Sequence, residues 1–173
     1  MKNLLVLFSV FMLSLVAFPQ SSVNLTVKLN PIQSITVNNQ QSDVILDYVT
    51  KSDYESGVSV LLQDHLTVFS TGGFEIKAKS SNPSLISSGR EIALSDITIT
   101  PFDGSTKPLN NSQYSPVTLS QSNQTLVSSS KGSVDRNFNV SYAAKGDYEY
   151  IDMYVSGQPN EFKTIVQYSI VPR

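Results

Sequence analysis

Apolar and polar residues alternate at a spacing of two through most of this chain, a period that belongs to strands with one buried face. Val23, Leu25, Val27 and Leu29 open the pattern, and Asn, Thr and Lys stand between them. Beyond the N-terminal region, no stretch keeps apolar residues at the helical spacing i, i+3, i+4, i+7. We therefore expect strands throughout, with helix limited to about one turn near residues 52–56.

Further alternating or β-branched runs follow, separated by clusters of Ser, Asn, Gly and Pro; they cover residues 35–37, 44–48, 66–68, 74–78, 97–99, 138–142 and 164–171. Pro31 interrupts the first run without changing its phase, which is typical of an edge strand because proline has no N–H to donate. The sequence predicts an all-β fold, an antiparallel Ig-like or pilin-like β-sandwich of about 8 to 9 strands, in preference to a closed barrel. We expect the Ser-rich stretches 80–88 and 110–133 to be surface loops or weak strands.

Residues 64–81, DHLTVFSTGGFEIKAKSS, combine the chain's only histidine with a glycine pair. The alternating runs on either side of Gly72 and Gly73 predict a hairpin, with these glycines supplying positive φ in its turn. A phosphate-binding loop would lead into a helix instead. The apolar positions of the two runs are expected to supply central core: Leu66, Val68, Phe74, Ile76 and Ala78. His65 falls on the strand face opposite Leu66 and Val68, so we predict a surface or capping histidine.

Residues 1–22 are predicted to be a secretory signal peptide. Lys2 precedes an apolar run of about 15 residues, shorter than the roughly 20 that a membrane-spanning helix requires. The cleavage point falls between Ala17 and Ser22. Residues 23–173 then form a single secreted β-sandwich domain, and no second apolar run of spanning length follows.

Composition excludes several kinds of function. Loss of Lys2 with the leader leaves 11 Lys and Arg residues against 14 Asp and Glu residues, which gives no electrostatic reason to expect nucleic acid or an anionic membrane surface. Without cysteine, and with one histidine, the chain lacks thiolate ligands and a multi-histidine zinc site. A Ser-His-Asp triad through His65 is formally available, but no G-x-S-x-G motif accompanies it. We expect no enzyme activity, no cofactor and no metal.

Acidic and tyrosine residues cluster towards the C-terminus. Asp147, Glu149 and Asp152, together with Asp53 and Glu55, offer oxygen ligands for calcium, but their spacing matches no calcium loop, so we expect solvated loops. The tyrosines of the same region divide into two groups. Alternation places Tyr142 and Tyr168 in the core, whereas a second group could form a saccharide or peptide platform: Tyr148, Tyr150 and Tyr154.

Three segments, residues 66–80, 94–101 and 168–172, resemble in their order the strands of secreted bacterial sandwich domains of the pilin-like and WxL-type surface proteins. The chain has no tryptophan, so it lacks the motif that names the WxL group. The resemblance implies a non-catalytic role in the periplasm or at the surface of a bacterium, and it supplies no catalytic residue.

We therefore expect a secreted cell-envelope or surface protein that acts in structural assembly or adhesion. The alternative is a peptidoglycan- or glycan-binding module. Partners would be other envelope or surface proteins, or cell-wall glycan. Oligomers are expected if strands are exchanged, in which case residues 23–37 are either the chain's own first strand or a strand donated to another copy.

Overall fold

The structure is a computed structural model that describes residues 20–154 and 160–173. The chain divides into two units, residues 1–30 and residues 31–173, which are described separately below. The predicted signal peptide lies outside the described residues except for residues 20–22. The compact unit begins at Pro31, whereas the sequence predicted a domain that starts at Val23.

Residues 31–173 form a mainly β unit with one short α-helix. Its elements are β1 Gln33–Val37, η1 Asn39–Gln41, α2 Lys51–Ser56, β2 Val58–Ser70, β3 Phe74–Ser80, β4 Ser84–Ser87, β5 Arg90–Ala93, η2 Leu94–Asp96, β6 Ile97–Asp103, β7 Gln113–Tyr114, β8 Val117–Thr118, β9 Gln124–Ser129, β10 Ser133–Ala144 and β11 Val166–Pro172, where η marks a 3-10 helix. The helix α2 confirms the turn expected near residues 52–56.

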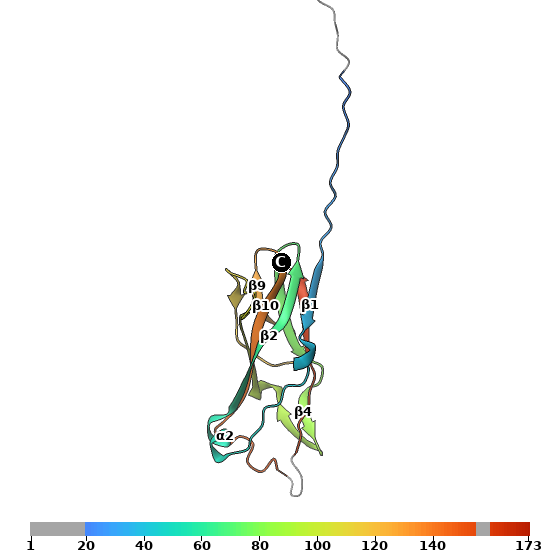
Figure 1. Cartoon of the computed structure of the whole chain (residues 1–173). Helices are drawn as coiled ribbons and strands as arrows, with labels where there is room; N and C mark the ends of the chain where they lie inside the picture. Colours follow the sequence, from blue (N-terminus) through green and yellow to red (C-terminus); the bar gives the residue numbers. More distant parts are fainter. Residues whose placement is uncertain (1–19, 155–159) are drawn as a thin grey trace, which may run out of the picture. The chain divides into compact units, whose positions relative to one another are not determined.

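Two antiparallel sheets form the body of this unit (Figure 1). One has five strands in the order β1-β2-β10-β6-β8, and the other has four in the order β11-β3-β9-β7. A third, two-stranded sheet pairs β4 with β5. The predicted all-β antiparallel sandwich is confirmed, with eleven strands in the described residues instead of eight or nine. Five strands were not predicted as separate runs, and four of them are short: β4, β5, β7 and β8 have two to four residues each. The fifth, β9, has six residues with Leu126 and Val127 fully buried, so part of the stretch 110–133 is a core strand and not a loop or weak strand.

The core lies between the two sheets and follows the alternation of the strands. In β3, Phe74, Ile76 and Ala78 are buried while the residues between them are half-buried. Phe138 of β10 meets Phe74 edge to face, with ring centroids 6.4 Å apart. Because these two strands belong to opposite sheets, the ring pair joins the sheets at the centre of the sandwich. Residues 44–48 form no strand, but their alternating side chains, Val44, Leu46 and Tyr48, still pack against this core.

Strand β2 contains a bulge that changes the position of its histidine. Leu62 pairs with Val140 and Leu66 with Phe138, so residues 63–65 lie opposite Asn139 alone. Asp64 at the centre of the bulge has φ 49°. Its backbone N–H donates to Asn139 Oδ1 at 2.7 Å, and its carboxylate accepts from Ser105 N at 2.7 Å. The extra residues turn His65 inward beside Leu66, so the predicted surface histidine is wrong: His65 is 2% exposed.

Gly72 and Gly73 form the turn between β2 and β3, but this turn does not close a hairpin. Strand β2 lies in the five-stranded sheet and β3 in the four-stranded sheet, so the turn crosses from one sheet to the other. Neither glycine has positive φ. Close approach explains Gly73, where a Cβ would lie 3.1 Å from the Ser129 carbonyl oxygen. The neighbouring turn needs Gly132 more strongly, because a Cβ there would lie 2.5 Å from the Ser70 carbonyl oxygen.

Candidate functional site

The single imidazole of the chain belongs to a buried polar network. His65 Nδ1 lies 3.0 Å from Gln41 Oε1, and His65 Nε2 lies 3.0 Å from the Tyr142 hydroxyl. The Tyr142 hydroxyl is in turn hydrogen-bonded to that of Tyr168. The network joins β2 and β10 of one sheet to β11 of the other, so Tyr142 and Tyr168 have the inward positions expected of them. Both nitrogens of the imidazole are engaged by structural partners, so His65 serves packing between the sheets.

Burial lowers the pKa of His65 from 6.5 to about 4. Between pH 6.5 and about pH 4, the imidazole is therefore protonated in the unfolded chain but neutral in the folded chain. The folded state loses stability as the pH falls through this range. Between pH 7 and pH 5 we expect urea unfolding to show a loss of about 2 kcal/mol from this group. Since the chain has no other histidine, His65→Gln should remove this loss, and an unchanged pH dependence in the variant would contradict the assignment.

The tyrosines predicted to bind a ligand do not lie together on one exposed face. Tyr148 and Tyr154 are 41% and 60% exposed, but Tyr150 is 8% exposed. The Tyr150 ring packs edge to face on Tyr48 with centroids 5.2 Å apart, and Tyr48 packs on Tyr54 at the same distance. Burial is the largest cause that raises the pKa of Tyr150, and the neighbouring Tyr48 and Asp96 raise it further. Tyr150 therefore anchors the loop after β10, which leaves Tyr148 and Tyr154 as the solvent-facing members of the predicted platform.

Residues 20–30 carry the most exposed apolar side chains of the described chain. They form no strand or helix, although Val23, Leu25, Val27 and Leu29 alternate with polar residues. These four side chains are 75% to 89% exposed. Burying one such aliphatic side chain contributes about 1.5 to 3 kcal/mol, so pairing of this segment with a sheet that covers the four side chains would be strongly favourable. The predicted first strand is thus divided: residues 33–37 form β1, and residues 23–29 are unpaired.

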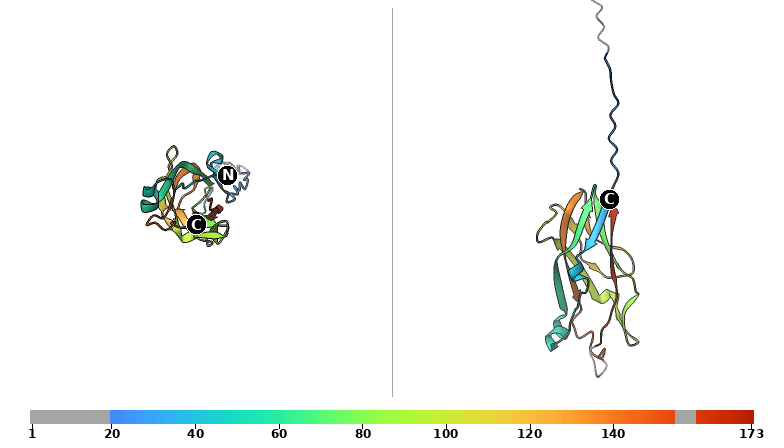
Figure 2. Two further views of the ribbon diagram at one scale, coloured as in Figure 1. Left: turned by 90° about the horizontal axis from the view of Figure 1, so that it is seen from below. Right: turned by 45° about the vertical axis from the view of Figure 1, so that its right-hand side comes forward.

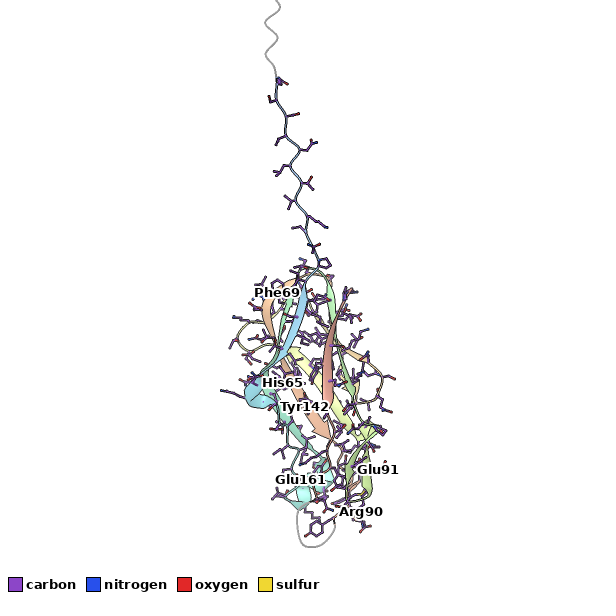
Figure 3. The ribbon with its side chains drawn as sticks, turned by 90° about the vertical axis from the view of Figure 1, so that its right-hand side faces the viewer. His65, Phe69, Arg90, Glu91, Tyr142 and Glu161 are labelled. Carbon is purple, nitrogen blue, oxygen red and sulfur yellow. The ribbon has the colours of Figure 1, made fainter. Side chains whose placement is uncertain are left out.

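Strands β1 and β11 have free edges that face each other. β1 pairs with β2 and β11 pairs with β3, and no ladder joins β1 to β11. The two strands lie side by side and run in opposite directions (Figure 2). Their inward side chains are only partly buried: Ile35, Val37, Val166, Tyr168 and Ile170. We call these two facing strands the β1–β11 seam, behind which His65 and Tyr142 lie (Figure 3).

The seam has few of the features that usually protect a sheet edge. Exposed edges attract further strands unless they are short or carry charges, prolines or bulges. The outer strands β7 and β8 have two residues each and the strands β4 and β5 of the third sheet have four each, whereas β1 has five and β11 has seven. Neither β1 nor β11 contains a charged residue, and the single proline is Pro172 at the end of β11. Of the sheet edges in the described chain, the seam is therefore the best suited to accept another strand.

No family profile matches this chain, and no curated protein matches its sequence.

Within residues 20–154 and 160–173, no helix is long and apolar enough to span a membrane. The same residues contain no group of three or more acidic or histidine side chains placed to hold a metal ion, including the acidic residues weighed above as calcium ligands.

Proposed function

We propose that this protein is a secreted, non-catalytic structural subunit of a bacterial envelope or surface, which assembles by strand addition. Residues 23–29 of one copy add to the β1–β11 seam of another copy. The observation that carries the proposal is the exposure of four alternating apolar side chains in an otherwise unpaired segment. Strand addition of this kind satisfies main-chain hydrogen bonds and buries alternate side chains, and therefore needs no reactive group.

Residues 23–29 and the β1–β11 seam match in length and in the pattern of their side chains. The alternating segment covers seven residues, 23–29, and β11 also has seven. Val23, Leu25, Val27 and Leu29 would extend the inward row formed by Ile35, Val37 and the partly buried residues of β11. Asn24, Thr26 and Lys28 would then face solvent, as polar residues do on the outer face of a sheet.

A peptide of residues 22–30 tests the seam as an acceptor. The chain with Leu25→Asp and Val27→Asp cannot supply its own strand, so it offers a free seam. We expect the wild-type peptide to bind this chain saturably and to raise its Tm, because bound ligand stabilises the folded state. A peptide with the same two replacements is the control. No binding of the wild-type peptide, or equal binding of both peptides, would refute strand addition at the seam.

A further inference from the structure

The end of the compact unit that carries α2 is acidic. Residues 51–56, 90–96 and 145–152 contain seven carboxylates and three basic side chains, which leaves four formal negative charges. These segments form one surface: Asp147 N donates to Glu55 O at 2.9 Å, and Lys145 Nζ lies 2.6 Å from Asp96 Oδ1. Arg90 and Glu91 lie at this end, far along the unit from Phe69 (Figure 3). We call this surface the acidic end.

A cavity of about 370 Å³ opens in the acidic end. Lys145 is tied to Asp96, which is 7% exposed, so this pair is already neutralised. The other two carboxylates of the lining, Glu91 and Glu149, form no ion pair with any described residue. Ile92, Ala93 and Met153 supply an apolar wall. An apolar wall with two unpaired carboxylates suits a side chain with an aliphatic stem and a cationic head, which lysine and arginine have.

The opposite end of the same unit presents basic side chains. The chain enters there, because Thr71 N donates to Ile32 O at 3.0 Å, and it finishes there, because Arg173 N donates to Gly73 O at 3.1 Å. The turns 71–73 and 130–132 and residue 173 contain two exposed basic side chains, Lys131 and Arg173, and no acidic side chain. With the α-carboxylate of Arg173, these segments carry one formal positive charge. In Figure 2 the C-terminus marks this end, opposite the helix α2. We call it the basic end.

We infer that in the assembly the acidic end of one copy binds the basic end of the next, with a basic side chain of the second copy, Lys131 or Arg173, directed to the cavity between Glu91 and Glu149. This inference rests on the proposed strand addition, which brings two copies together. Opposite charges on the two ends of one chain favour head-to-tail contacts, which are heterologous and can propagate.

The charge pattern also sets the direction of the added strand. Residues 23–29 are joined to the basic end of their own copy through residue 30 and Pro31. That basic end meets the acidic end of the neighbouring copy only if the added strand leaves the seam towards α2. The strand then runs parallel to β1 and antiparallel to β11, and the antiparallel ladder is the slightly more stable of the two kinds.

Charge reversal within one chain tests the contact. The first variant carries Lys131→Glu and Arg173→Glu, the second carries Glu91→Lys and Glu149→Lys, and the third combines all four. Assembly of the full mature chain is followed by light scattering at low and high salt. We expect each of the first two variants to assemble at least about tenfold more slowly at low salt, and the third to return to within about threefold of wild type. A mixture of the first two should assemble faster than either alone.

A matched control reverses Lys79 and Lys107, which gives the same change of net charge as the first variant away from both ends. Its assembly should stay close to wild type. The end-to-end contact is overturned if the first variant behaves like this control, or if the third variant remains as slow as the first two. Failure of the proposed function would look different, because the wild-type chain would then not assemble at any salt concentration.

Discussion

Replacing Leu25 and Val27 by aspartate is expected to leave the protein folded but to abolish its assembly. Both side chains are at least 75% exposed in the single chain, so the stability of the compact unit should change by less than about 0.5 kcal/mol. In the seam of another copy the same positions would become buried. Loss of two buried aliphatic groups costs about 4 kcal/mol, which weakens association about a thousandfold, and burial of two carboxylates adds to this loss.

The control for this variant carries Asn24→Asp and Thr26→Asp. It has the same net charge and lies in the same segment, but its changes fall on the polar positions that would face solvent. Sedimentation velocity should show polymers for the control and monomers for the Leu25→Asp, Val27→Asp chain. Equal assembly of the two chains would show that the alternation of this segment has no role.

Truncation of the central aromatic pair is expected to give the largest loss of stability. Phe138 is fully buried and its ring contacts those of Phe74 and Tyr114. Phe138→Ala removes the contact that joins the two sheets at their centre and leaves a cavity, so we expect the free energy of unfolding to fall by about 3 to 5 kcal/mol. Urea denaturation at pH 7 measures this difference directly.

Phe102→Ala on the neighbouring strand β6 is the matched comparison. Its ring is 45% exposed on the outer face, where position 102 pairs with Asn139. We expect its replacement to lower the free energy of unfolding by less than about 1 kcal/mol. Similar losses for the two variants would mean that the core does not lie where the alternation and the structure place it.

Alternation was sufficient to predict the sandwich and much of its core. Leu66, Val68, Phe74, Ile76 and Ala78 were predicted to be central core residues, and all five are at most 1% exposed. These positions could be predicted from the sequence of each strand alone, because a period of two assigns its two faces without reference to the neighbouring strands. The same rule misplaced His65, because the bulge at Asp64 depends on the Asn139 side chain and the Ser105 backbone N–H, which are distant in sequence.

The glycine pair shows a second limit of local patterns. Residues 70–73 have the composition of a hairpin turn, yet β2 and β3 separate into different sheets. Strand order is decided by long-range pairing, here of β2 with β10 and of β3 with β9, which a local turn signal does not contain. In the same way, residues 23–29 could be found from their own alternation. The β1–β11 seam depends on the packing of the first strand beside the last, which no local pattern contains.

One signal for the seam was present in the sequence. Residues 166–172 combine β-branched and aromatic residues with no charge, which is unusual for a strand that ends up at an edge. An uncharged final strand is equally compatible with a central position, so the sequence alone could not distinguish the two. The structure makes the distinction because β11 pairs on one side only.

Disulfide trapping tests strand addition most directly, because the chain contains no cysteine of its own. Thr26→Cys places a thiol at the centre of the added segment, and Ser169→Cys places one near the centre of β11. When the two variants are refolded together and mildly oxidised, we predict a covalent dimer containing one chain of each kind. Thr100→Cys, on the interior strand β6, replaces Ser169→Cys in the control and should give little dimer. Dimer formation that is absent with Ser169→Cys, or equally efficient with Thr100→Cys, would contradict the account.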